Sequence, residues 1–167
     1  FQLAANQNYL EALYDLGLIH HAGKYGKRDI KKAIHYYSLV ANQNIPEAQF
    51  NLGIIYSGRE YVERDINKAI HYFSLAANQN LPEAQIGLGN IYYEGKQVER
   101  DINKTIHYYS LAVKQNYPIA QYNLGFFYYE GKYIKRDLNK AIHYFSLAAN
   151  QNYPRAQLLL GVIYYQG

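Results

Sequence analysis

Histidine is the residue of this chain whose spacing most readily suggests chemistry. His35, His71, His107 and His143 recur at intervals of 36 residues. A metal ion binds its ligands at about 2 Å, whereas packed helices of successive repeats lie roughly 10 Å apart. The ladder therefore cannot place two imidazoles on one ion. Two interpretations stay open: a solvated helix face, or a contact surface whose binding changes with pH, since imidazole titrates near neutrality.

Catalytic groups do not converge in this sequence. The chain contains no cysteine, which excludes disulfides and thiolate chemistry. Acid–base or nucleophilic catalysis needs side chains held within hydrogen-bond distance in one pocket, but here each candidate recurs once per 36 residues. Motifs of phosphate loops, serine elbows and metalloproteases are also lacking. We therefore predict that the chain is not an enzyme, and we expect no metal, no cofactor and no small-molecule substrate.

Arginine recurs at the same interval and predicts a basic edge. This basic edge consists of Arg28, Arg64, Arg100 and Arg136. Such a strip could hold an acidic tail or a phosphate backbone. However, each arginine directly precedes an aspartate, several glutamates lie near, and the net charge is only +4. We therefore favour a solvated, partly self-neutralised edge over a binding site.

One repeating unit underlies all of these spacings. The segment KAIHYFSLAANQN occurs at 68–80 and again at 140–152. A fixed period of this length is typical of stacked-repeat architectures. The full repeats should cover residues 10–45, 46–81, 82–117 and 118–153, with half-repeats at 1–9 and 154–167. Because neither end carries the polar capping helix of a solenoid, we expect the chain to be a fragment of a longer array.

Each repeat is predicted to form two helices. Apolar residues recur with helical spacing from Ile66 to Ala77, and Asp65 can cap the free amides of that first turn. Asn80 should end this helix in the left-handed conformation, where glycine would serve equally well. The same role is expected for Asn44, Asn116 and Asn152. Pro82 suits the first turn of the next helix.

The repeat resembles a known family. The resemblance rests on Ala48, Leu52, Gly53 and Tyr56 in the first helix, and on Asp65, Ala69, Tyr72, Phe73, Ala76 and Ala77 in the second. This pattern is similar to the Sel-1-like repeat family, a branch of the tetratricopeptide superfamily, over essentially the whole chain. The resemblance implies an all-α, right-handed α-solenoid of helix–turn–helix repeats. It also implies a protein–protein interaction scaffold, since such proteins serve as adaptors in endoplasmic-reticulum quality control and in signalling complexes.

The first helix of each repeat has a second apolar face opposite its core face. In related solenoids the columns of this face line the concave groove that receives a peptide. Nine of the ten residues here are apolar, which a plain solvent face would not tolerate. They are Tyr14, Leu18, Phe50, Ile54, Ile86, Asn90, Tyr122, Phe126, Leu158 and Val162. Two interpretations stay open: a partner-binding groove, or a face that neighbouring helices bury.

These observations favour a scaffold or adaptor that binds other proteins within a larger complex. A structural spacer without its own ligand is the alternative. A nucleic-acid-binding helical-repeat protein is less favoured, because reading bases requires polar side chains in the variable columns. No apolar run approaches the roughly 20 residues of a membrane span, and the first residues do not form a signal peptide. The expected localisation is therefore cytoplasmic, with the endoplasmic reticulum as the alternative.

Overall fold

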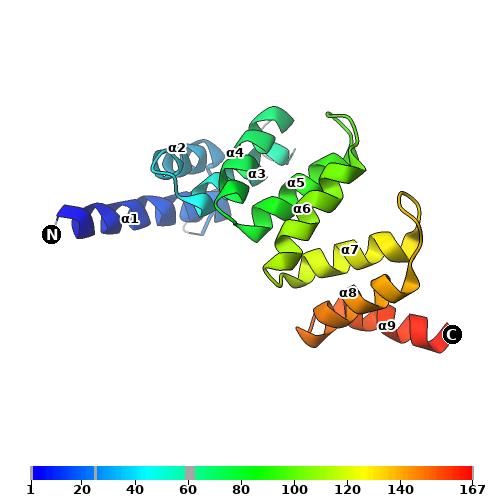
Figure 1. The fold of residues 1–167 in the computed structure, drawn as a ribbon. Coiled ribbons are helices and arrows are strands. Elements are labelled where there is room, and N and C mark those ends of the chain that lie inside the picture. The colour runs from blue at the N-terminus through cyan, green and yellow to red at the C-terminus, as the bar shows by residue number, and fades with distance from the viewer. Residues whose placement is uncertain (1, 25, 59–62, 167) are drawn as a thin grey trace. The chain divides into compact units, whose positions relative to one another are not determined.

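The computed structural model describes residues 2–24, 26–58 and 63–166, and it is all-α over these residues (Figure 1). They form nine helices and no strand. The helices are α1 (Gln2–Ala22), α2 (Ile30–Ala41), α3 (Pro46–Ser57), α4 (Ile66–Asn78), α5 (Pro82–Glu94), α6 (Ile102–Lys114), α7 (Pro118–Glu130), α8 (Leu138–Asn150) and α9 (Pro154–Gln166). The predicted fold of paired helices is confirmed.

The chain divides into two compact units, 1–87 and 88–167, and the division falls inside α5. In the first unit α1 packs against α2 and α3 packs against α4. In the second unit α7 packs against α8, and α8 also contacts α9. The two helices of a repeat are therefore neighbours in space as well as in sequence.

The predicted helix ends are confirmed. Oδ1 of Asp65 accepts a hydrogen bond from the backbone amide of Lys68 at 3.0 Å, and aspartate caps α2, α6 and α8 in the same way. Proline opens the first helix of four repeats, where its missing N–H costs nothing. The four asparagines after the second helices have φ between 59° and 64°. Asparagine thus ends these helices in the left-handed region.

The core of each repeat depends on a glycine that faces an aromatic ring. Phe73 of α4 is buried against Gly53 of α3. A Cβ atom built on Gly53 would lie 2.5 Å from the Phe73 ring, closer than carbon atoms can approach. The same relation joins Gly17 to Tyr37 and Gly89 to Tyr109. The missing side chain therefore lets the second helix pack closely against the first.

The predicted half-repeat at residues 1–9 continues into the first helix of the next repeat, because α1 runs without a break from Gln2 to Ala22. Position 10, which is proline in the later repeats, is a leucine. Proline disfavours the helical conformation at the residue before it, and Leu10 imposes no such restriction. Nothing in the local sequence therefore stops α1 at this position.

Candidate functional site

The apolar face of the first helices divides into two columns. The inner column consists of Tyr14, Phe50, Ile86, Tyr122 and Leu158, and the outer column of Leu18, Ile54, Asn90, Phe126 and Val162. In the first unit the inner rings of Tyr14 and Phe50 lie against the buried rings of Tyr37 and Phe73, with centroids 5.8 and 5.7 Å apart. Ile86 is also buried. In this unit the inner column therefore contributes to the core.

The outer column of the first unit is open to solvent. Leu18 is 40% exposed and Ile54 is 41% exposed. The backbone around them is regular helix, so neither side chain serves to end a helix or form a turn. Leu18 and Ile54 are therefore the two members of the outer column in this unit that a partner could bury.

In the second unit Tyr122 and Phe126 of the two columns belong to an aromatic cluster. Tyr122 lies between Phe126, Phe145 and Tyr153, at centroid distances of 6.1, 5.8 and 5.3 Å. Burial raises the pKa of the Tyr122 hydroxyl, which Arg155 counteracts. Val162 is half-buried, whereas Leu158 is 69% exposed. Asn90, the polar member of the columns, accepts a hydrogen bond from Tyr109 at 2.6 Å.

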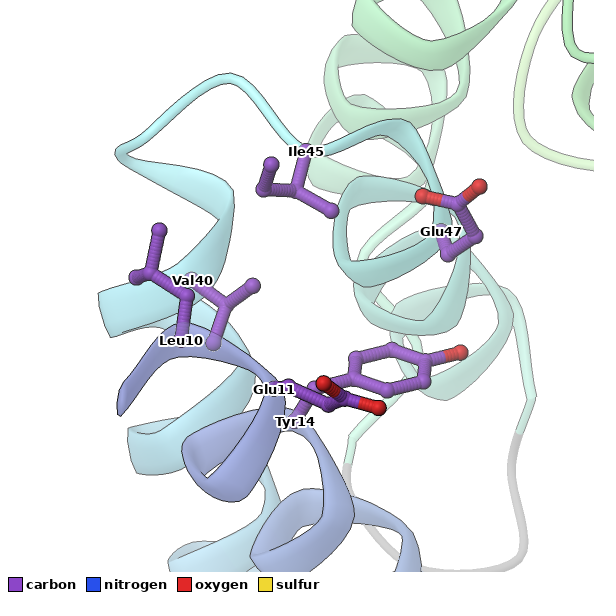
Figure 2. A pocket seen from close by; sticks show the side chains of 6 residues that line it. All are labelled: Leu10, Glu11, Tyr14, Val40, Ile45 and Glu47. Carbon is purple, nitrogen blue, oxygen red and sulfur yellow. The ribbon is translucent and has the colours of Figure 1, made fainter. Parts of the chain in front are cut away.

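The first unit contains a pocket of about 280 Å³ that is lined by residues of α1, α2 and the start of α3 (Figure 2). Its lining consists of Leu10, Glu11, Tyr14, Val40, Ile45 and Glu47. The Tyr14 hydroxyl accepts a hydrogen bond from Asn51 Nδ2 at 3.0 Å, which links α1 to α3. Burial raises the pKa of Tyr14, and the charges of Glu47 and Asp15 raise it further.

Sequence reasoning identified Tyr14 but not the pocket beside it. The glutamates at 11 and 47 belong to a column that continues with Glu83, Ile119 and Arg155. The change of this column from acidic to basic residues along the chain is the sequence signal that could have indicated an acidic site in the first unit.

The arginines of the basic edge are engaged in local contacts. Arg100 Nε donates to the carbonyl of Tyr93 at 2.9 Å, Nη2 to the carbonyl of Glu94 at 3.3 Å, and Nη1 to the Tyr133 hydroxyl at 3.0 Å. These carbonyls belong to the last turn of α5. The guanidinium of Arg136 lies 5.8 Å from the centre of the Tyr129 ring. Arg28 and Arg64 also interact with neighbouring groups.

The histidine ladder lies on the exposed side of the second helices. Each of its rings meets the following tyrosine edge-on, with centroids 5.1–5.4 Å apart. Over the part of the chain that the structure describes, no three histidine or acidic side chains come together as metal ligands would. The recurring feature of the ladder is thus an exposed imidazole beside a tyrosine ring.

Comparisons with known proteins agree with the helical pairs. The family model described as Sel1 repeat matches residues 10–45, 46–81, 82–117, 118–153 and 154–167. No curated protein matches the sequence.

Three chains illustrate the similarity to solved structures. A Sel1 repeat protein from Oxalobacter formigenes has 34% identity and a TM-score of 0.85 over 93% of this chain and 63% of its own. The protective antigen c5321 of uropathogenic Escherichia coli has 28% identity and a TM-score of 0.61 over 100% of this chain and 44% of its own. Helicobacter pylori cysteine-rich protein B has 26% identity and a TM-score of 0.62 over 79% of this chain and 95% of its own. The chain thus spans less than two thirds of the first two proteins.

Among the described residues, no helix combines the length and the apolar character that a membrane crossing requires.

Proposed function

Since the chain belongs to the Sel1 repeat family, whose repeats are generally protein–protein interaction modules, we propose that it is a scaffold or adaptor that binds a partner protein along the apolar face of its first helices. The observation that carries this proposal is the exposure of Leu18 and Ile54. Leu18 lies one helical turn after Tyr14 on α1, and Ile54 lies one turn after Phe50 on α3. Exposed apolar side chains that gather on one face are typical of protein interfaces.

The members of the two columns pack differently, and we propose different roles for them. Tyr14, Phe50 and Tyr122 contact buried rings of the second helices. Their proposed role is to stabilise the packing beneath the exposed side chains. Leu18, Ile54 and Leu158 have room to be covered by a partner. Hot spots of protein interfaces are residues that become fully desolvated on binding. The exposed members are therefore the better candidates for direct contact.

A structural spacer remains the second candidate, because rings of the protein's own second helices already pack against Tyr14, Phe50 and Tyr122 of the inner column. Nucleic-acid binding is disfavoured by the chemistry of the same face, since bases are read by hydrogen-bonding and stacking groups. The two candidates differ in one respect that can be measured. A scaffold loses its partner when the exposed apolar residues change, whereas a spacer does not.

Site-specific photo-crosslinking distinguishes them. A benzoylphenylalanine group placed at Ile54 should form an adduct with one partner protein in cells. The matched control is the same group at His71, which is exposed on α4. The adduct at Ile54 should disappear when Leu18 is changed to glutamate. Adducts that are absent at both positions would support the spacer, and an adduct confined to His71 would assign binding to the histidine face.

A further inference from the structure

We infer that the pocket between α1 and α3 binds a basic side chain, lysine or arginine, of the partner protein. This inference rests on the proposed function and specifies the chemistry of the partner. The pocket volume of about 280 Å³ falls just below the roughly 300–1,000 Å³ of small-molecule sites. The pocket is therefore suited to a single side chain of a bound protein.

The apolar part of the pocket suits the stem of such a side chain. Leu10, Val40 and Ile45 lie on one side, and Tyr14 and Glu47 on the other (Figure 2). Lysine and arginine bury their methylene groups along apolar surfaces and leave the charged end at the polar rim. A neutral apolar side chain would fill the same space but would leave the acidic rim without a counter-charge.

The rim of the pocket carries negative charge. Glu11 and Glu47 are both exposed, and no lysine, arginine or histidine is among the described residues that line the pocket. The Tyr14 ring lies at the same rim, held by its hydrogen bond from Asn51. A cation within about 6 Å of a ring centre is attracted to its face. Two carboxylates and one ring therefore form a site of complementary charge for a cation.

A second observation places this charge at the ring. Glu47 lies near enough to the Tyr14 hydroxyl to raise its pKa, in addition to the larger effect of burial. The carboxylate of Glu47 therefore acts electrostatically on a group that lines the pocket. An anionic ligand would meet both glutamates and would be repelled.

The corresponding place in the second unit provides an internal comparison. There Tyr122 takes the place of Tyr14, Tyr153 that of Ile45, and Arg155 that of Glu47. The Tyr153 ring lies against Tyr122 with centroids 5.3 Å apart, and the neighbouring charge is positive. In the second unit a tyrosine ring thus stands where the first unit has the Ile45 side chain, and an arginine stands where it has Glu47. The preference for a basic side chain should be confined to the first unit.

The test uses hexylammonium as a mimic of the lysine side chain. The methyl signals of Val40 and Ile45 are followed by NMR in the full 167-residue chain while hexylammonium is added. Saturable shifts are expected, and they should weaken as salt screens the charges. Hexanol has the same stem without the charge, and hexanoate has the opposite charge. Hexanol should bind more weakly and hexanoate should not bind.

Variants connect this binding to the named residues. Changing Glu11 and Glu47 together to glutamine should weaken hexylammonium binding by about three- to tenfold, as expected for the loss of two exposed charge contacts. The matched control is Glu83→Gln, in the same column but outside the pocket, and it should leave binding unchanged. Ile45→Tyr should fill the pocket as Tyr153 does in the second unit and abolish binding. Circular dichroism should show unchanged helix content in all three proteins.

Equal affinity for hexanol and hexylammonium, or no saturable shift with either, would overturn the inference. The proposed function is tested separately by the photo-crosslink at Ile54. If that adduct forms but hexylammonium does not bind, the scaffold function stands and the basic-side-chain pocket fails. If Glu11→Gln with Glu47→Gln also reduces the adduct, whereas Glu83→Gln does not, the pocket contributes to partner binding.

Discussion

The side-chain amide of Gln79 donates a hydrogen bond to Oε1 of Gln49 at 2.9 Å, which joins the end of α4 to the start of α3. Both amides also donate to Oδ1 of Asn44, at 3.1 and 3.2 Å. The second unit contains the same cluster, formed by Asn116, Gln121 and Gln151. The asparagine that ends a helix by its left-handed backbone thus also accepts hydrogen bonds from the following repeat.

This cluster changes the expectation that glycine would serve equally well at these positions. Asn116→Gly keeps the positive φ but removes the acceptor of two glutamine amides, and Gln121 is buried. Leaving buried donors unsatisfied should lower the free energy of unfolding by about 1–2 kcal/mol. Urea unfolding followed by far-ultraviolet circular dichroism measures this change.

Asn152→Gly is the matched control. Asn152 has the same backbone conformation, with φ of 61°, and its side chain forms no hydrogen bond to another described residue. Its replacement should change the free energy of unfolding by less than about 1 kcal/mol. Equal losses in the two variants would show that the backbone alone, and not the acceptor, determines the preference for asparagine.

The glycine that faces the aromatic ring gives a second prediction. Gly53→Ala places a methyl group against Phe73 and should lower the free energy of unfolding by about 1–3 kcal/mol, as overpacked cores do. Gly161→Ala adds the same atom where nothing lies within 4 Å. It should be neutral or stabilising by up to about 1 kcal/mol, because alanine favours helix over glycine. Thermal unfolding of both variants checks the difference in sign.

The helix pairs could be predicted because their signals are local. Asp65, Asn80 and Pro82 each act on backbone within four residues of themselves, so their types were sufficient. The cluster of Gln49 and Gln79 was not predicted, because its members are 30 residues apart and meet only after two helices have packed.

The division of the apolar face could not be predicted for a related reason. Tyr14 and Leu18 are both apolar and lie one helical turn apart, yet the first packs on Tyr37 and the second is open to solvent. Residue type does not separate these two situations, since the exposure of each depends on the angle at which α2 crosses α1. The pocket likewise depends on the sizes of side chains from three helices.

Alkaline pH should destabilise the second unit through Tyr109. Its hydroxyl is buried and donates to Asn90 at 2.6 Å, and burial raises its pKa far above the ordinary value. The contribution to stability is therefore complete below the unfolded pKa of about 10 and is lost as the pH rises toward the folded pKa. Two other repeats have phenylalanine, Phe73 and Phe145, at the position of Tyr109. The melting temperature of the Tyr109→Phe variant should therefore fall less than that of the unmodified protein between about pH 9 and pH 11.

Arg100 should contribute to stability rather than to binding. Arg100→Gln removes donors to two carbonyls at the end of α5 and to Tyr133, and should lower the free energy of unfolding by about 1 kcal/mol. Arg136→Gln, which loses a contact with the Tyr129 ring, should cost about half as much. If Arg100→Gln left stability unchanged but abolished partner capture, the basic edge would be the binding surface.

The last prediction separates the binding surface from the core. Leu18 and Ile54 are exposed, so changing both to alanine should leave the melting temperature nearly unchanged but weaken partner binding by about 1–3 kcal/mol, the scale of interface hot spots. Tyr122 packs on Phe145, and Phe126 packs on Tyr122. Changing this pair to alanine should instead lower the free energy of unfolding by about 2–4 kcal/mol.

Isothermal titration with the partner identified by crosslinking, together with thermal unfolding, measures both quantities for each double variant. Because binding and unfolding are measured on the same proteins, a loss of affinity cannot be mistaken for a loss of fold. A Leu18 and Ile54 variant that binds normally would remove the outer column from the interface and leave the spacer as the better account of the first unit. A Tyr122 and Phe126 variant that keeps its stability but loses binding would return the aromatic cluster of the second unit to the interface.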